Sequence, residues 1–287
     1  MEPLTKNGAG ADWLPYLTVA TEAARVGGAV LRQYFGRLVE ETDIAEKQPG
    51  DLVTIADRES EAAILAVLRR HCPEFEVLAE ESGRQGDRGD WLWAVDPLDG
   101  TTNFAHGYPF ATVSIGLLYR GEPVVGVVYD PFHDELFRGA IGEGAVCWSG
   151  GQARPLRPST TAHLAQSLWV TGFAYDRRQV KDNNYAEFCH FTHLTQGVRR
   201  SGSAALDLAY VAAGRFDGYW ERGLSPWDLA AGVVLVRAAG GKVTAYDGTP
   251  LDLASGRILA TNGLLHTAAI ATLATVSPLP VSFPVTL

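Results

Sequence analysis

The segment Trp91–Phe104, which reads WLWAVDPLDGTTNF, constrains the fold more than any other part of the chain. Its apolar beginning predicts a short buried strand at Trp91–Val95. Two carboxylates three residues apart, Asp96 and Asp99, follow this strand, and Gly-Thr-Thr comes directly after them. We therefore expect a sheet that brings both acids together at the end of one of its strands.

These two acids suit a hard cation. Carboxylates that converge at a strand end favour Mg²⁺, which takes octahedral oxygen ligands and retains waters that a substrate phosphate can replace. The Leu98 carbonyl could add an oxygen, and the N–H groups of Gly100 and Thr101 would cradle a phosphate if they open a short helix. The alternative is an Asp-Pro-x-Asp-Gly turn without function, because Asp, Pro and Gly all form turns.

Two further segments supply acids of the same kind. Glu80 and Glu81 end a predicted strand at Phe75–Ala79. Because neighbouring side chains of an extended chain point to opposite faces, we expect only one of the two to bind a metal. The run Ser225-Pro-Trp-Asp228 predicts a helix start, with Ser225 as its cap and Asp228 in its first turn. The helix dipole alone favours an acid there, so a structural role for Asp228 stays open.

The pattern around these acids predicts a mixed α/β fold. Apolar residues at helical spacing predict an amphipathic helix from Trp13 to Phe35, and Asp57 is well placed to cap a second helix from Arg58 to about His71. Runs separated by turn residues predict an antiparallel meander. The predicted strands are Leu52–Ile55, Thr112–Tyr119, Glu122–Tyr129, Glu135–Ala140 and Gly241–Ala245, with extended chain at Ala145–Pro155 around a turn at Gly150-Gly151. Further helices are near Asn184–Thr195, Ala204–Ala213 and Pro226–Ala239; loops are at Glu40–Gly50 and Glu81–Asp90; and Val276–Leu287 is an extended tail.

No internal repeat, low-complexity segment or linker divides the chain. At roughly 150 residues per domain, 287 residues allow one large domain or two coupled lobes. We expect residues 1–287 to be one compact unit, with an α+β lobe at about 13–155 and an α/β lobe at about 156–275.

The chain is acidic, with 24 Lys and Arg against 33 Asp and Glu and a net charge of −9. This balance argues against nucleic-acid binding by a basic surface. An anionic substrate would have to be attracted by something other than net charge, and a bound metal is the obvious candidate. Cys72, Cys147 and Cys189 lack zinc-type spacing, so we expect free thiols in a reducing cytosol. His190 and His193 beside Cys189 are more typical of helix surface than of a metal site. We expect a cytoplasmic protein without a signal peptide or membrane span.

Together these motifs resemble the inositol monophosphatase family of Mg²⁺-dependent, lithium-sensitive sugar phosphatases. The resemblance covers roughly Leu14 to Ala274 and looks closest to bacterial and plastid-type members. It implies the family's layered αβαβα sandwich and a homodimer. The motifs that carry it are Asp51-Leu-Val-Thr-Ile-Ala-Asp57, Glu80-Glu-Ser, Trp93-Ala-Val-Asp96-Pro-Leu-Asp99-Gly-Thr-Thr-Asn-Phe104, Gly202-Ser-Ala-Ala-Leu-Asp207 and Trp227-Asp228-Leu-Ala-Ala-Gly232.

The resemblance implies phosphate hydrolysis with two Mg²⁺ ions. Glu80 and Asp96, with the Leu98 carbonyl, would bind one ion. Asp96, Asp99 and Asp228 would bind the other, so that Asp96 bridges the two. One ion would generate the nucleophile from water and the other would stabilise the leaving oxygen. The choice of Glu80 over Glu81 rests on the resemblance alone.

Three more residues acquire roles near the metals by resemblance. Thr101 and Asp57 are similar to the pair that orients the attacking water, Thr101 as a hydroxyl relay and Asp57 as its acceptor. The alternative for Asp57 is a helix cap alone. Lys47 falls in the loop where the family has a basic residue near the metals, although a solvated surface lysine explains it nearly as well.

The implied substrate is a small sugar or cyclitol phosphate. Gly202, Ser203 and Ala204 would bind its hydroxyls through backbone and side chain. Glu221 would accept hydrogen bonds from two neighbouring hydroxyls, which suits inositol. The remaining predicted contacts to substrate are Leu98, Asp99, Gly100, Thr101, Asp228 and Lys47. Asp207 is expected to pack inside the helix that follows and is not counted as a site residue.

We expect hydrolysis of inositol 1-phosphate. The alternative is fructose-1,6-bisphosphatase activity, alone or as a dual function, since relatives with Gly-Ser-Ala-Ala-Leu-Asp include such enzymes. Histidinol-phosphate and 3′-phosphoadenosine phosphatases are less favoured. The alternative of a different class is a catalytically inactive scaffold that binds partners. The choice between the two sugar phosphates, the oligomeric state, the number of resting Mg²⁺ ions and regulation are open at this point.

Overall fold

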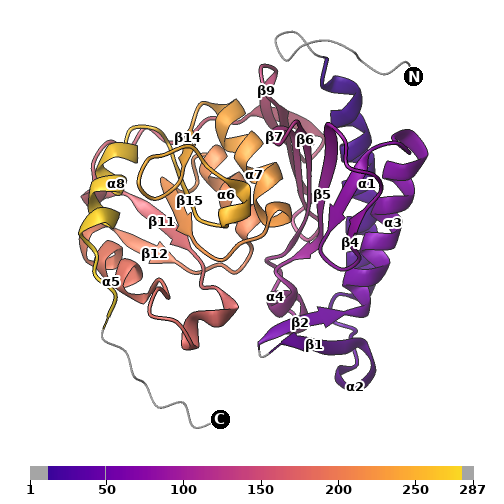
Figure 1. Cartoon of the computed structure of the whole chain (residues 1–287), viewed down its shortest axis with the longest axis horizontal. Coiled ribbons are helices and arrows are strands. Elements are labelled where there is room, and N and C mark those ends of the chain that lie inside the picture. Colours follow the sequence, from indigo (N-terminus) through magenta and orange to yellow (C-terminus); the bar gives the residue numbers. More distant parts are fainter. Residues whose placement is uncertain (1–11, 49, 280–287) are drawn as a thin grey trace.

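The computed structural model describes residues 12–48 and 50–279. These residues form five layers that lie side by side in Figure 1: helices, a large sheet, helices, a smaller sheet and helices. The predicted α/β class and αβαβα sandwich are confirmed. The division into two lobes near residue 155 stays a prediction. Residues 276–279 are not helical, and the rest of the predicted tail, 280–287, lies outside the described residues.

The large sheet has eight strands. They are β3 (Glu76–Ala79), β4 (Gly83–Gln85), β5 (Trp91–Asp99), β6 (Thr112–Tyr119), β7 (Glu122–Asp130), β8 (Glu135–Ala140), β9 (Gly144–Ser149) and β10 (Gln152–Pro155). Their spatial order is β10-β9-β8-β7-β6-β5-β3-β4. The strands from β5 to β10 pair antiparallel with their sequence neighbours, which confirms the predicted meander, whereas β3 and β5 run parallel.

Helices α1 (Leu14–Tyr34) and α3 (Ile55–His71) cover the outer face of this sheet (Figure 1). The start of α3 differs from the prediction, because Thr54 rather than Asp57 is the residue that caps it. The Thr54 hydroxyl accepts the Ala56 N–H at 3.1 Å, and Asp57 is the third residue of the helix. Asp57 completes a capping box, because its carboxylate accepts the Thr54 N–H at 2.8 Å.

Helices α6 (Ala204–Ala212) and α7 (Pro226–Ala239) fill the layer between the two sheets (Figure 1). Helix α7 packs directly on the backbones of β6 and β7, where both strands carry glycine. A Cβ atom at Gly126 would lie 2.3 Å from the Ala231 carbonyl oxygen, so only glycine permits this approach. The close contact brings the first turn of α7 to the end of β5.

The smaller sheet follows in the chain. Its strands, in the order β12-β11-β13-β15-β14, are β11 (Leu168–Thr171), β12 (Gly197–Arg199), β13 (Gly218–Glu221), β14 (Lys242–Thr244) and β15 (Ile258–Thr261). Helices α5 (Tyr185–Leu194) and α8 (His266–Thr275) cover its outer face, where the buried rings of Trp169, Phe191 and Trp220 form a small core. The helices predicted near 184–195, 204–213 and 226–239 are therefore confirmed.

Two segments predicted as loops contain regular structure. Glu40–Gly50 holds α2 (Glu40–Asp43) and β1 (Ile44–Gln48), and β1 forms an antiparallel hairpin with β2 (Asp51–Thr54). Glu81–Asp90 holds β4, which pairs with β3. Strands β1 and β4 are mostly polar, so no hydrophobic pattern in the sequence predicts them. Their backbone pairing with neighbouring strands identifies them. None of the helices in the described residues is long and apolar enough to cross a membrane.

Candidate active site

The two acids of the first motif lie at the end of β5, which continues past the predicted Val95. On a regular strand, residues three apart point to opposite faces, but the pairing of β5 with β6 is irregular between Asp96 and Asp99. Both acids consequently line one cavity of about 460 Å³. Asp96 is 2% exposed, and its Oδ1 accepts the Leu98 N–H at 2.9 Å.

A glycine turn connects these acids to the next predicted site residue. Gly100 adopts the left-handed conformation, with φ of 103°, and a Cβ atom there would lie 2.9 Å from the Phe110 carbonyl oxygen. Helix α4 (Thr101–Ala105) begins directly after it. The Thr101 hydroxyl lies 3.0 Å from Asp57 Oδ1 and 3.0 Å from the Leu98 carbonyl oxygen. Because the hydroxyl has a single hydrogen, it donates to one of these acceptors at a time.

Asp57 lies behind the cavity wall. Its side chain is fully buried, and Oδ2 accepts the N–H of Thr54 at 2.8 Å and the Thr54 hydroxyl at 2.7 Å. Burial raises the pKa of Asp57 to about 7, although the Thr54 hydrogen bonds oppose the increase. The structure thus brings Thr101 and Asp57 together, with Thr101 facing the cavity. Every other residue predicted for the site lines this cavity.

Glu80 and Glu81 do not point to opposite faces, so that prediction was wrong. The extended chain ends just before them, and the buried Glu61 carboxylate holds a turn there by accepting the N–H groups of Glu81 and of the next residue at 2.8 and 3.0 Å. The Lys47 ammonium consequently reaches both acids, 2.9 Å from Glu80 Oε1 and 2.5 Å from Glu81 Oε1. Of the two acids, Glu80 lines the cavity.

Asp228 lies in the first turn of α7, in the helix layer between the two sheets. The predicted helix start is confirmed, because the Ser225 N–H donates to Asp228 Oδ2 at 2.7 Å in the first turn of α7. The Ser114 hydroxyl of β6 donates to the Trp227 carbonyl oxygen at 3.1 Å, and Ser114 is also the residue that pairs with Asp96. This contact holds the first turn of α7, and with it Asp228, against the end of β5.

Burial and neighbouring carboxylates raise the pKa values of Asp96, Asp99 and Asp228. Burial, together with the charges of Glu80, Asp99 and Asp228, raises the pKa of Asp96 well above its ordinary value. Burial and the neighbouring carboxylates do the same for the pKa of Asp228. Burial raises the pKa of Asp99 only to about 6, because hydrogen-bond donors stabilise its charged form. Carboxylates this close to one another favour either protonation or a bound cation.

The donor set fits a divalent cation in chemistry and charge. Carboxylate oxygens and the Leu98 carbonyl are the hard ligands that Mg²⁺ prefers, and the ion pair of Lys47 with Glu80 does not balance four acids. In the part of the chain that the structure describes, no three Asp, Glu, His or Cys side chains already form a metal-binding group. Glu80 forms an ion pair with Lys47, so a metal ion bound by Glu80 would compete with Lys47 for the carboxylate.

The predicted substrate residues lie on the facing wall of the cavity. Gly202 and Ala204 line it, but the Ser203 hydroxyl donates to Asp99 Oδ2 at 2.7 Å and so positions a metal-ligand candidate. Glu221 accepts the Tyr219 hydroxyl at 2.7 Å, and burial raises its pKa to about 7. The Glu221 carboxylate packs so closely on Gly172 that a Cβ atom there would lie 2.1 Å from Oε2.

Several lining residues were missed by the sequence reasoning. Arg177 and Tyr175 come from a short 3-10 helix, Tyr175–Arg178, and Arg200 precedes the Gly202 motif. Asp207 is buried in α6 as expected, yet it also lines the cavity, and its Oδ1 has no hydrogen-bond partner among the described residues. Arg200 could have been found from its place beside the motif, whereas no local signal marks Arg177.

Comparison with known proteins identifies the family of this chain. Residues 12–277 match the sequence model of the inositol monophosphatase family. An inositol-1-monophosphatase from Synechocystis sp. is 58% identical over 257 residues, which cover 89% of this chain and 87% of that protein. The Nus factor SuhB from Pseudomonas aeruginosa is 42% identical, over 86% of this chain and 92% of its own length. The solved structure of an inositol monophosphatase from Anabaena (Nostoc) sp. has a TM-score of 0.84 at 60% identity and covers 93% of this chain and 98% of that one. The chain therefore belongs to the inositol monophosphatase family.

Proposed function

We propose that this protein is a Mg²⁺-dependent phosphomonoesterase that hydrolyses inositol 1-phosphate to inositol and phosphate. The observation that carries the proposal is the convergence of four carboxylates, from β5, the turn after β3 and the start of α7, beside the Thr101–Asp57 hydrogen bond. The relative that is 58% identical bears the name inositol-1-monophosphatase, which supports the same substrate here.

The chemistry divides between the metal and the chain. Bound Mg²⁺ lowers the pKa of water and neutralises charge on the phosphate. Glu80, Asp96 and the Leu98 carbonyl would hold one ion. Asp96, Asp99 and Asp228 would hold the other.

Thr101 and Asp57 would handle the proton of the attacking water. Thr101 Oγ1 accepts a hydrogen bond from this water while its own hydrogen points to Asp57 Oδ1. Burial raises the pKa of Asp57, which favours uptake of a proton by its carboxylate.

The facing wall would bind the sugar. The N–H groups of Gly100 and Thr101, at the start of α4, would donate hydrogen bonds to the substrate phosphate. Glu221 would accept hydrogen bonds from ring hydroxyls, and the Gly202 and Ala204 backbone would bind the others. Glu221 donates when protonated and accepts when ionised, so its pKa of about 7 suits either partner.

One observation favours a second candidate substrate, fructose 1,6-bisphosphate. Arg177 and Arg200 line the same cavity as the acids. Their guanidinium groups could balance a second phosphate that inositol 1-phosphate does not have. Both substrates belong to the same class of phosphate monoesters, and the choice between them is a matter of relative rate.

The test is a panel at equal Mg²⁺: inositol 1-phosphate, fructose 1,6-bisphosphate, histidinol phosphate and 3′-phosphoadenosine 5′-phosphate, each with an EDTA control. We expect the highest kcat/KM for inositol 1-phosphate and no turnover in EDTA. A lead of more than about tenfold for fructose 1,6-bisphosphate, about 1.4 kcal/mol, would replace the inositol assignment. Absence of turnover on every ester would favour the partner-binding scaffold, a role that the name Nus factor SuhB of another relative makes worth testing. The homodimer and the cytoplasmic location stay predictions.

A further inference from the structure

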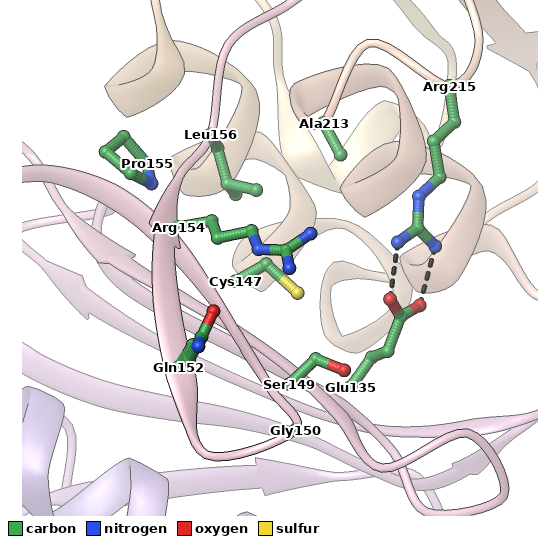
Figure 2. Close-up of a pocket in the computed structure, with 10 residues that line it drawn as sticks. All are labelled: Glu135, Cys147, Ser149, Gly150, Gln152, Arg154, Pro155, Leu156, Ala213 and Arg215. Carbon is green, nitrogen blue, oxygen red and sulfur yellow. Dashed lines mark hydrogen bonds and ion pairs between the residues drawn. The ribbon is translucent and has the colours of Figure 1, made fainter.

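A second cavity, of about 480 Å³, lies at the hairpin of β9 and β10 (Figure 2). None of the described residues that line it lines the candidate active site. Helix α6 separates the two cavities, since Ala204 at its start lines the active site and Ala213 just after its end lines the second cavity. The second cavity is therefore a distinct feature of the fold.

The floor of this cavity is one face of the sheet edge. Arg154 pairs with Cys147, and Gln152 pairs with Ser149, across the antiparallel hairpin. Paired residues of antiparallel strands point to the same face, so these four side chains gather on the side of the sheet that faces α6. Strand β10 is the outermost strand, which leaves Arg154 and Gln152 accessible from solvent.

The opposite wall comes from the turn after α6, and its arginine is already paired. Arg215 donates to both oxygens of Glu135, at 2.6 and 2.5 Å, and its guanidinium lies 4.3 Å from the centre of the Tyr210 ring. Figure 2 shows this pair on the far side of the cavity from Arg154. Arg215 and Glu135 therefore add no net charge, and their contacts keep this wall in place.

Arg154 is the unbalanced charge of the cavity. Its guanidinium extends over Cys147 toward the Arg215–Glu135 pair in Figure 2, and no carboxylate of the described residues lies within ion-pair distance of it. Cys147 stays neutral, because burial raises the pKa of its thiol to about 11. The cavity thus has one net positive charge, within a chain whose net charge is −9.

We propose that this cavity binds a small organic anion, with one carboxylate or phosphate group on a compact apolar body. The planar guanidinium of Arg154 matches two oxygens of such a group, and the Gln152 amide and the Ser149 hydroxyl, which also line the cavity, are further hydrogen-bond donors. Leu156, Ala213 and the neutral Cys147 thiol offer the apolar surface for the body. The site is independent of the phosphatase activity proposed above.

Isothermal titration calorimetry on the full chain with Mg²⁺ tests this site. The probes are butyrate, propylphosphonate and uncharged 1-butanol, which share a short apolar body, and a phosphatase cannot hydrolyse the C–P bond of the phosphonate. The key variant is Arg154→Gln, which removes the charge and keeps a hydrogen-bond donor. The matched control is Arg88→Gln, which removes another exposed arginine, outside both cavities. A second variant is Ala213→Leu, which puts a larger side chain into the cavity.

We expect at least one anion to bind, with affinity lowered about tenfold or more in Arg154→Gln, lowered also in Ala213→Leu, and unchanged in Arg88→Gln. Butyrate or propylphosphonate as the better ligand would identify the carboxylate or the phosphate as the preferred group. Equal affinity of the wild type and Arg154→Gln for both anions would overturn the proposal, as would 1-butanol binding as tightly as the anions. Failure of both anions to bind would also overturn it.

Discussion

Asp57→Asn separates the two roles that the structure gives to Asp57. The carboxylate accepts two hydrogen bonds from Thr54 and one from Thr101, at 2.8, 2.7 and 3.0 Å. An asparagine oxygen can keep the Thr54 bonds only by turning its NH₂ group toward Thr101 Oγ1. The Thr101 hydroxyl would then donate to the Leu98 carbonyl oxygen, also 3.0 Å away, which cannot take up a proton. We therefore expect kcat to fall while KM for the sugar phosphate changes little.

The magnitude follows from what such a proton acceptor contributes. General acid–base groups typically contribute about 10²- to 10⁴-fold, which corresponds to about 3–5 kcal/mol of activation free energy. Thr101→Ala interrupts the same relay, so we expect a loss of kcat in the same range. If the two residues act as one relay, the double variant should be little worse than the worse single variant.

The matched control is Thr54→Ala, which removes the cap and leaves the Thr101–Asp57 hydrogen bond in place. It should cost about 1–2 kcal/mol of unfolding free energy. Because it also removes the Thr54 hydroxyl bond that lowers the pKa of Asp57, kcat should fall, but much less than in Asp57→Asn. The assays are steady-state kinetics at saturating Mg²⁺ on the best substrate of the panel, and urea unfolding of each variant. Multiplicative losses in the double variant would refute the relay. Normal kcat in Asp57→Asn, with a stability loss of about 1 kcal/mol, would leave Asp57 as a helix cap only.

Four further predictions concern the metals and the sugar. Asp96→Asn removes the proposed bridging ligand, so activity should fall by several orders of magnitude while the circular dichroism spectrum stays native. Activity should require Mg²⁺; Ca²⁺ should inhibit because its coordination is larger and looser, and by family resemblance Li⁺ should inhibit as well, which ion titrations of the rate measure. Glu221→Ala should lower kcat/KM for inositol 1-phosphate by roughly 10- to 150-fold, since a charged hydrogen bond contributes roughly 1.5–3 kcal/mol, and glycerol 2-phosphate should lose less. In the metal-free protein, burial raises the pKa of Glu221 from 4.5 to about 7, so the folded state retains a proton that the unfolded chain has lost. The unfolding free energy should therefore fall as pH rises between these two values, and Glu221→Gln should reduce this slope in urea titrations.

Each of these predictions has an outcome that contradicts it. A folded Asp96→Asn variant with more than about a tenth of wild-type activity, a loss under about 1.4 kcal/mol, would refute the two-metal assignment. Full activity in EDTA would contradict the whole metal-dependent mechanism, whereas lithium resistance would count only against the second metal site. Unchanged kinetics in Glu221→Ala would refute the account of inositol recognition, and an equal pH slope in Glu221→Gln would assign the slope to other acids.

The sequence by itself determined the features that depend on neighbouring residues. The helix start at Ser225–Asp228, the strand that leads to Asp96 and the meander of alternating strands were all readable, because caps and apolar periods extend over only a few residues. The motifs also identified the four acids and Thr101, which line one cavity in the structure. Polar elements such as β1 and β4 escaped this reasoning, since backbone pairing rather than side-chain pattern defines them.

Only the tertiary structure decided which distant groups meet. The Ser203 hydroxyl reaches Asp99 across 104 residues of chain, and Lys47 reaches Glu80 across 33, because packed layers bring these segments together. The same packing places Arg177 in the active-site cavity. It also places Arg154, whose charge has no acidic partner among the described residues, in the second cavity near the end of α6. No local pattern encodes such contacts, because each depends on the relative position of two layers, and that position is set by the sum of many buried contacts between them.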